Sequence, residues 1–257
     1  MPRAAIVGPR GFIGAAVRAE LESRGYDTVL LDRGSDTATV PRCDLGFFCA
    51  GSSAAYLSTI DPIRCLQANV VDLYGYLASL KVDRWVHMSS LSVYPIASAS
   101  KSEDAPVDLS RLSVYGMHKS LAETYVRTFA QTAIVLRVGY LYGKGLRKNL
   151  LFDLRSGRTE LFLTADSVLA PLDVALLADA AASLAEKADT GTYNVASRYV
   201  LTAAEIASLK GGAFVFLGER HIDERGVALE RLSKYWSQPQ SQAGHVESVR
   251  SYLEGHE

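Results

Sequence analysis

Apolar and polar positions follow two alternating patterns along the first half of the chain. Short apolar runs, such as AAIVG at 4–8 and YDTVLLD at 26–32, lead into longer segments whose apolar residues recur every three or four positions. The first pattern is typical of buried strands and the second of amphipathic helices. The sequence predicts further strands at 44–51, 84–90 and 133–139, and helices at 12–25, 65–80 and 115–130.

Strands that alternate with helices are typical of a parallel sheet covered on both faces. We therefore expect an α/β protein with a Rossmann-type, doubly wound parallel sheet. After Gly143 the alternation loosens, although residues 174–186 keep a strong helical pattern. The expected division is a dinucleotide-binding core over residues 1–143 and a small substrate-binding cap formed mainly by 144–257, some segments of which return to the core. Such a cap belongs above the carboxyl ends of the strands, where open α/β sheets bind ligands.

Composition narrows the class of protein. The 257 residues include 48% hydrophobic residues, enough for a sizeable core, and the net charge of −1 gives no general attraction to nucleic acid or to a membrane surface. Cys43, Cys49 and Cys65 form no CxxC pair and have no histidine at ligand spacing, so no metal site is expected. Without a leader pattern or a long apolar span, we expect a cytoplasmic protein that binds a small molecule.

The stretch GPRGFIG at 8–14 lies between a predicted strand and a predicted helix. In that context Gly8 permits a tight turn, Gly11 lets the backbone approach a pyrophosphate, and Gly14 lets the helix pack closely. Asp32 ends the next strand, where a carboxylate accepts hydrogen bonds from the adenosine ribose. The residues predicted to bind a dinucleotide are Gly8, Arg10, Gly11, Phe12, Ile13, Gly14, Asp32, Arg33, Ala50, Gly51, Tyr115 and Lys119.

The identity of that dinucleotide stays open between NAD and NADP. Asp32 repels a phosphate on the 2′ position of the ribose, which favours NAD. Arg33 directly follows Asp32, and Arg10 lies in the glycine stretch. Charge-assisted hydrogen bonds from either arginine to that phosphate would favour NADP.

Tyr115 and Lys119 are four residues apart in a predicted helix, so they share one face. Hydride transfer to or from a carbinol needs a proton to move as well, and a tyrosine hydroxyl can carry it when a neighbouring ammonium lowers its pKa. Ser90, at the end of the strand RWVHMSS, is placed to hold the substrate oxygen. These three residues are the predicted catalytic set.

The chain resembles the extended short-chain dehydrogenase/reductase family, NAD-dependent epimerases and dehydratases that act mostly on nucleotide sugars. The resemblance rests on GPRGFIG, Asp32, FFCAG, the helix with Asn69, SSLSVY, YGMHK, LRVGYLYGKG, APLDVA and GTYNVAS. It implies the Rossmann fold, a nicotinamide cofactor, and catalytic roles for Ser90, Tyr115 and Lys119.

Departures from the family pattern narrow the reaction. Sugar dehydratases of the family carry an Asp-Glu pair after the catalytic serine or threonine, where this chain has Leu91 and Ser92. Two diphosphate contacts of the family are also replaced, an asparagine by Tyr140 and an arginine by Asp166. Candidate substrate-binding residues are therefore Ser90, Tyr140, Arg147 and Lys148. Asp173 is expected to cap a helix, His118 to point away from the catalytic face, and His87 to be a hydrogen-bonded core residue.

The favoured function is a ketoreductase that acts on a nucleotide-linked 4-keto-6-deoxyhexose. An epimerase that retains NAD is the alternative, because it uses the same three residues. A non-catalytic, cofactor-binding regulatory protein is disfavoured, since such relatives tend to lose Tyr115 or Lys119. The resemblance also implies a homodimer formed through the helices that follow the third and fourth strands.

Overall fold

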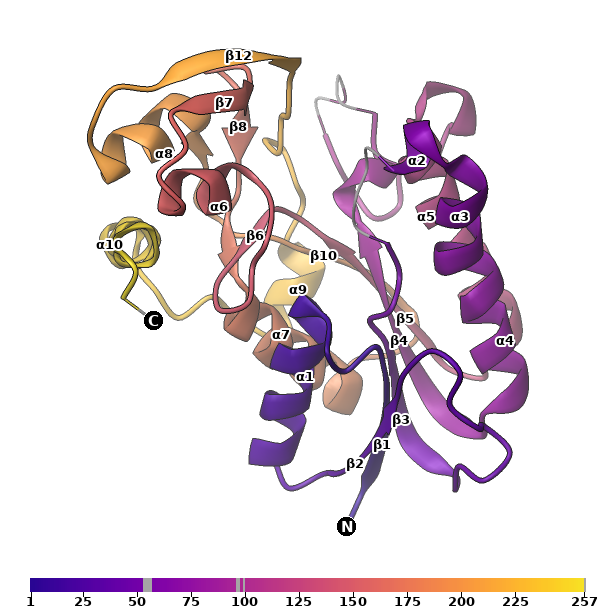
Figure 1. The fold of residues 1–257 in the computed structure, drawn as a ribbon. Coiled ribbons are helices and arrows are strands. Elements are labelled where there is room, and N and C mark those ends of the chain that lie inside the picture. Colours follow the sequence, from indigo (N-terminus) through magenta and orange to yellow (C-terminus); the bar gives the residue numbers. More distant parts are fainter. Residues whose placement is uncertain (53–56, 96–97, 99, 257) are drawn as a thin grey trace.

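A computed structural model describes residues 1–52, 57–95, 98 and 100–256. Its centre is a six-stranded sheet with the order β10-β5-β4-β3-β1-β2, and every pair in it is parallel (Figure 1). The fold is the α/β, Rossmann-type sheet that the sequence predicts. The strands are β1 (Arg3–Val7), β2 (Asp27–Leu31), β3 (Cys43–Phe48), β4 (Val82–Ser90), β5 (Ala133–Val138) and β10 (Gly191–Val195).

Helices cover both faces of this sheet (Figure 1). On one face α1 (Phe12–Ser23) packs against α7 (Val174–Lys187), and on the other lie α3 (Pro62–Leu66), α4 (Asp72–Ser79) and α5 (Val114–Phe129). Strand β1 serves both faces, because its alternate side chains enter separate apolar cores that include α1 and α7 or α4 and α5. Burial on both sides explains why β1 is an almost continuous apolar run.

The helix predicted over residues 65–80 contains a wide turn that the periodicity does not predict. Between α3 and α4, residues Gln67–Val71 form a π-helical turn, η1. Asn69 lies in this turn with no exposed surface. Single π-turns inside helices are frequent at functional sites, because they redirect a side chain that regular helical geometry would place elsewhere.

The order of the strands reverses next to β1, whose neighbours are β2 and β3. The connections from β1 and from β3 therefore leave the carboxyl edge of the sheet in opposite directions, which opens a crevice there. The glycine stretch lies directly at this point, between β1 and α1. The prediction that the strand at 26–32 is buried was wrong for most of its length, because β2 is the edge of the sheet and only Leu31 in it is buried.

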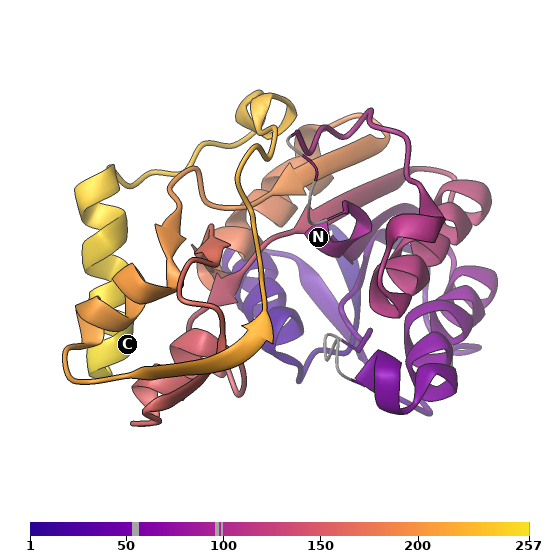
Figure 2. The same cartoon turned by 90° about the horizontal axis from the view of Figure 1, so that it is seen from above.

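Most of the chain after Tyr142 lies to one side of the central sheet, seen from above in Figure 2. Its apolar core contains residues from α6, α8 and α10. Helix α7 and strand β10 return to the central sheet. The elements of this part are β6 (Leu141–Tyr142), α6 (Leu150–Arg155), β7 (Glu160–Leu163), β8 (Val168–Leu169), β9 (Leu172–Asp173), β11 (Leu201–Thr202), α8 (Ala203–Lys210), β12 (Val215–Arg220), α9 (Glu230–Ser233) and α10 (Gln242–Glu254).

Short elements complete the chain: α2 (Leu57–Ile60), the 3-10 turn η2 (Leu91–Val93) after β4, and the 3-10 turn η3 (Leu109–Arg111) before α5. Several helices begin at polar caps that the sequence provides. Asp173 caps α7 as predicted, with its Oδ1 accepting a hydrogen bond of 2.8 Å from the amide of Ala175. Over the described ranges, none of the helices has the length and apolar character needed to cross a membrane.

Candidate active site

A cavity of about 1600 Å³ lies at the carboxyl edge of the sheet. The cavity extends from the glycine turn to the part of the chain after Tyr142, because residues of both line it. Of the predicted site residues, Gly14, Lys119 and Arg147 do not line it. Those that do are Gly8, Arg10, Gly11, Phe12, Ile13, Asp32, Arg33, Ala50, Gly51, Ser90, Tyr115, Tyr140 and Lys148.

The glycine turn is shaped by close backbone contacts. Gly8 has φ +82°, a conformation that favours glycine, and a Cβ added there would lie 2.8 Å from the Cα of Ala50. A Cβ on Gly14 would lie 2.0 Å from the carbonyl oxygen of Gly8, so this glycine lets α1 meet the turn itself. Gly11 has ordinary dihedrals, and its added Cβ would be 3.3 Å from the same oxygen.

The start of α1 suits an anion. Gly11 is the N-cap and offers no side chain to the first amides of the helix, and the first turn contains no acidic residue. Unpaired amides and the helix dipole make such an end a site for phosphate. Because Gly11, Phe12 and Ile13 line the cavity, this helix end faces it. The residues present therefore fit the pyrophosphate of a dinucleotide.

Asp32 lies just after β2 and is paired with Arg10. The guanidinium donates from Nε to Oδ1 at 3.1 Å, and Nη2 lies 3.1 Å from Oδ2. The Arg10 side chain is 82% exposed, so solvent screens this pair and leaves the arginine free to move toward another anion. The backbone around Asp32 is held by Ser35, whose Oγ accepts its amide, and by Tyr76, whose hydroxyl donates to its carbonyl.

Ser90 and Tyr115 reach the cavity from adjacent elements. Ser90 ends β4, and its Oγ accepts the amide of Ser92 at 3.1 Å. Helix α5 begins at Ser113, whose Oγ accepts the amide of Gly116 at 3.1 Å. A Cβ on Gly116 would lie 2.3 Å from the carbonyl oxygen of Ser92, so this glycine lets α5 pack against the turn that follows Ser90. Tyr115, the residue before Gly116, is thereby held at the side of the cavity that Ser90 lines.

Lys119 lies behind this side of the cavity, buried on α5. Its ammonium donates to the carbonyl oxygen of Met88 at 2.6 Å. Burial lowers the pKa of Lys119 from 10.5 to about 8, although the nearby carboxylate of Glu123 opposes the change. A Cβ on Gly51 would lie 3.5 Å from Nζ and 2.6 Å from Oδ1 of Asn69, a buried atom with no hydrogen-bond partner among the described residues.

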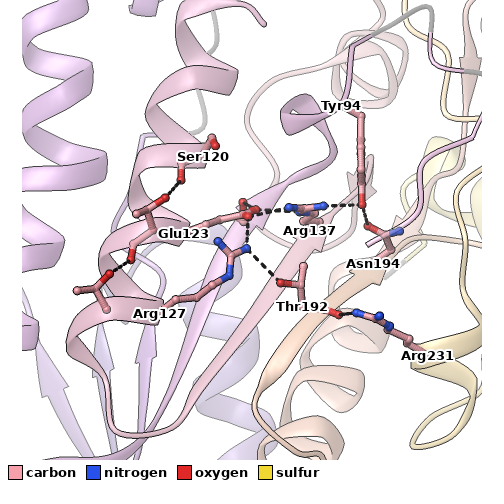
Figure 3. A network of polar contacts seen from close by, with 11 residues as sticks. Tyr94, Ser120, Glu123, Arg127, Arg137, Thr192, Asn194 and Arg231 are labelled. Carbon is pink, nitrogen blue, oxygen red and sulfur yellow. Dashed lines mark hydrogen bonds and ion pairs between the residues drawn. The ribbon is translucent and has the colours of Figure 1, made fainter. Parts of the chain in front are cut away.

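A buried network fixes α5 to the sheet one turn beyond Lys119 (Figure 3). Arg137 of β5 donates from Nε and Nη2 to the two carboxylate oxygens of Glu123, at 3.0 and 2.9 Å. Arg127 and Ser89 donate to the same carboxylate, and the Nη1 of Arg137 donates to the hydroxyl of Tyr94 at 2.8 Å. Because breaking a buried pair is costly, this network holds the helix that carries Tyr115 in one position.

The predicted substrate residues are placed unequally. Tyr140 follows β5 and lines the cavity, and its hydroxyl accepts a hydrogen bond of 2.9 Å from the amide of Leu150. Lys148 is exposed and also lines the cavity, but Arg147 is exposed elsewhere. Asp166 is 81% exposed beside His221. The basic loop therefore brings one cation to the cavity and not two.

The prediction that His87 is hydrogen-bonded was wrong. His87 is 1% exposed, and neither ring nitrogen has a partner among the residues that the structure describes. Its ring stacks on Phe48 instead, with centroids 5.9 Å apart. Burial, with the positive charges of Lys119 and Arg127, lowers its pKa well below 6.5, so it remains neutral. His118 is buried and does not line the cavity, as expected.

Two residues that the sequence reasoning did not assign belong to this site. Asn69 lies in the π-turn with its Oδ1 close to Gly51, and the sequence does not set it apart from the other polar residues of the helical segment 65–80. Glu224 lines the cavity from the C-terminal part of the chain. No local motif surrounds Glu224, so only the tertiary structure brings it here. Within the described ranges, no group of three or more His, Cys, Asp or Glu residues is arranged to hold a metal ion.

The model of the family described as NAD dependent epimerase/dehydratase matches residues 4–155, more than half of the chain. The chain belongs to this family. A comparison with curated proteins gives no match. The matched residues of this family member include the glycine turn, Asp32, Ser90, Tyr115 and Lys119. Glu224 lies outside the matched range.

Several solved structures are similar to this family member over their whole length. MoeE5 in complex with UDP-glucuronic acid and NAD is 20% identical, with 98% of this chain and 100% of that chain covered and a TM-score of 0.82. TunA, an NAD dependent NDP-hexosamine 5,6-dehydratase, is 20% identical over 99% and 97%, with a TM-score of 0.84. The dTDP-4-dehydrorhamnose reductase of Bacillus anthracis, in complex with NADP, is 18% identical over 97% and 99%, with a TM-score of 0.79. At these identities the likeness establishes the fold.

Proposed function

We propose that the protein is an NAD(P)-dependent oxidoreductase that reduces a nucleotide-linked 4-keto-6-deoxyhexose. The observation that carries this proposal is the meeting of two features in one cavity, the uncapped glycine turn and the pair Ser90 and Tyr115 with Lys119 buried behind them. The family match and the nucleotide sugars bound by similar structures support the substrate class. We further propose that residues 1–143 bind the cofactor and that 144–257 mainly bind the substrate.

In this proposal each residue has one task. The glycine turn and the start of α1 hold the pyrophosphate. Asp32 accepts hydrogen bonds from the ribose of NAD, or Arg10 and Arg33 bind the 2′-phosphate of NADP. The bound nicotinamide supplies or accepts the hydride. Ser90 donates a hydrogen bond to the carbonyl oxygen of the sugar, and Tyr115 transfers its phenolic proton to that oxygen. The ammonium of Lys119 stabilises the resulting phenolate, and Tyr140 and Lys148 contact the nucleotide sugar.

Leu91 and Ser92 follow Ser90 where dehydratases of the family carry two acids, which favours reduction over loss of water. The test uses dTDP-linked and UDP-linked 4-keto-6-deoxyhexoses with NADH and with NADPH. We expect loss of reduced-cofactor absorbance in step with formation of the 6-deoxyhexose. Turnover of neither sugar with either cofactor would contradict the proposal.

The second candidate is an epimerase that keeps NAD bound, and the specific observation in its favour is the carboxylate of Asp32 at the ribose end of the cavity. Incubation of UDP-glucose with the NAD-loaded protein separates the two functions. An epimerase converts the sugar to its epimer without net change in the cofactor. A regulatory protein without catalysis would bind the cofactor and convert neither substrate.

We also propose that the protein forms a homodimer through α4 and α5, the helices that follow β3 and β4. Their outer surface carries Tyr74, Leu121 and Phe129, which are 41%, 38% and 51% exposed. The rings of Tyr74 and Phe129 are in contact, with centroids 4.9 Å apart, so these two side chains form one apolar patch across the two helices. Light scattering is expected to give twice the mass of 27.8 kDa, and Phe129→Asp is expected to return it to that value.

A further inference from the structure

Glu224 is a buried carboxyl group in the wall of the cavity with no assigned task. It lies in the segment between β12 and α9, is 8% exposed and lines the cavity together with Ser90 and Tyr115. Carboxylates are rarely buried unless a cation or several hydrogen bonds compensate for the lost water. Its surroundings therefore indicate what it can bind.

One of its two oxygens is fixed by the backbone. Oε2 accepts the amide of Ala170 at 2.7 Å and the amide of Tyr140 at 3.3 Å. Ala170 lies between β8 and β9 and Tyr140 follows β5, so the cap and the central sheet hold the side chain together. Oε1 accepts no hydrogen bond from the part of the chain that the structure describes.

That second oxygen lies at the catalytic end of the sheet. A Cβ built on Gly139 would lie 3.4 Å from Oε1 of Glu224. Gly139 directly follows Val138, which is the partner of Ser90 in the register of β4 and β5. The second oxygen is therefore beside the end of the strand that neighbours Ser90, and Ser90 and Glu224 line the same cavity.

The charges around Glu224 do not neutralise it. The ammonium of Lys101 donates to the carbonyl oxygens of Ser98 and Arg225, at 3.1 and 2.9 Å. Asp223 is paired with the guanidinium of Arg225, at 2.5 Å. His221 is next to Asp166, and the hydroxyl of Tyr140 accepts the amide of Leu150. No residue that the structure describes forms an ion pair with Glu224, and burial raises its pKa from 4.5 to about 7 despite its two backbone hydrogen bonds.

We propose that Glu224 is a substrate-binding residue whose Oε1 accepts a hydrogen bond from a hydroxyl group of the sugar. An ionised carboxylate only accepts hydrogen bonds and repels phosphate, so its partner is a hydroxyl and not the diphosphate. A bond to a buried charged acceptor contributes more than a bond between neutral groups. This assignment rests on the proposal that the substrate is a nucleotide sugar, and it makes Glu224 a determinant of which sugar is accepted.

The experiment is a calorimetric titration of the cofactor-loaded protein with UDP-glucose between pH 6 and pH 8. The two phosphates of this probe do not titrate in that range. The test variant is Glu224→Gln, whose amide oxygen can still accept both backbone amides. The control is Asp166→Asn, which removes one negative charge from an exposed position of the same cap.

The wild type and the control are expected to bind about fivefold to tenfold more tightly at pH 8 than at pH 6, because ionised Glu224 becomes the main form as the pH passes through 7. Glu224→Gln is expected to lose this pH dependence and to bind about tenfold more weakly than the wild type at pH 8. Thermal unfolding checks that the variant is folded, and if it is not, Glu224→Asp replaces it, which keeps the carboxylate but draws it back from the sugar and is expected to bind UDP-glucose more weakly than the wild type at pH 8.

The possible failures are distinguishable. Equal affinity and an equal pH profile in the wild type and in Glu224→Gln would overturn the role of Glu224 and leave the proposed function intact. Tighter binding at pH 6 would show that the neutral acid donates the bond, which also overturns the assignment. If UDP-glucose binds the wild type at no pH, the nucleotide-sugar proposal fails, and this inference fails with it.

Discussion

The two ends of the cavity are built in different ways. At the end proposed to bind the cofactor, Gly8, Gly11 and Gly14 lie within one stretch of seven residues, and their lack of a side chain permits its close backbone contacts. At the end proposed to bind the substrate, Tyr140 and Glu224 come from distant segments, and tertiary contacts hold their side chains. A backbone site written in consecutive residues can be read as a motif, whereas a side-chain site assembled from distant segments cannot.

The difference also concerns strain and charge. The cofactor end tolerates no added atom at Gly14, because the carbonyl oxygen of Gly8 would be 2.0 Å away. The substrate end has a titratable carboxyl group with a pKa near neutrality, for which burial is responsible. Substitutions at the cofactor end should therefore change folding and cofactor affinity together. Substitutions at the substrate end should change turnover, substrate affinity or pH dependence.

Tyr115→Phe is expected to give the largest effect and to separate the two ends most clearly. It removes the transferred proton only, so turnover should fall by roughly two to four orders of magnitude while cofactor affinity and unfolding temperature stay unchanged. Steady-state kinetics and a cofactor titration measure both. Tyr125→Phe, further along α5 against Tyr74, is the control and should retain activity. Near-normal turnover of Tyr115→Phe would remove Tyr115 from the proposed mechanism.

Gly14→Ala should disturb the cofactor end as a whole. Its methyl group would collide with the carbonyl group of Gly8, which cannot move without opening the turn. We therefore expect the free energy of unfolding to fall by about 3 kcal/mol and cofactor binding to be lost. Gly244→Ala in α10 is the control, because its Cβ meets only an ordinary contact of 3.4 Å with Ser241. Chemical denaturation measures both variants. Equal stability of the two would contradict the tight packing assigned to Gly14.

Gly11→Ala sharpens the comparison within the turn. Gly11 has φ −73°, so alanine fits its backbone, and the added Cβ would be 3.3 Å from the carbonyl oxygen of Gly8. We expect a stability loss of no more than about 1 kcal/mol but roughly tenfold weaker dinucleotide binding, because the methyl group occupies the approach to the pyrophosphate. Calorimetry with NAD and NADP tests this. Unchanged affinity would mean that the turn is purely structural.

Asp32→Ala is expected to have the smallest effect, since it alters preference and not binding as such. Asp32 is paired with Arg10, and removing the carboxylate frees that guanidinium for a phosphate on the ribose. We expect the wild type to prefer NAD and the variant to shift toward NADP by about tenfold. Dissociation constants at fixed ionic strength decide. A tenfold preference of the wild type for NADP would contradict this expectation and mean that Arg10 and Arg33 determine the choice of cofactor. Arg33→Ala should then weaken the binding of NADP but not that of NAD.

Much of the fold and of the cofactor end could be predicted from the sequence. Strand β1 is an apolar run with both faces covered, and that pattern is visible without a structure. The helix N-cap at Asp173 could also be predicted, because an N-cap involves residues adjacent in sequence. Their arrangement depends on neighbours along the chain, and so the sequence alone determined them.

The tertiary structure decided the rest. The burial of His87, the pair between Arg10 and Asp32, and the position of Glu224 all depend on which distant segments meet. The pKa of Glu224 has the same origin, because burial is produced by packing between the cap and the sheet and not by the residues next to it in sequence. Local backbone geometry is written into short stretches of sequence, whereas burial and electrostatic pairing exist only once the chain has folded.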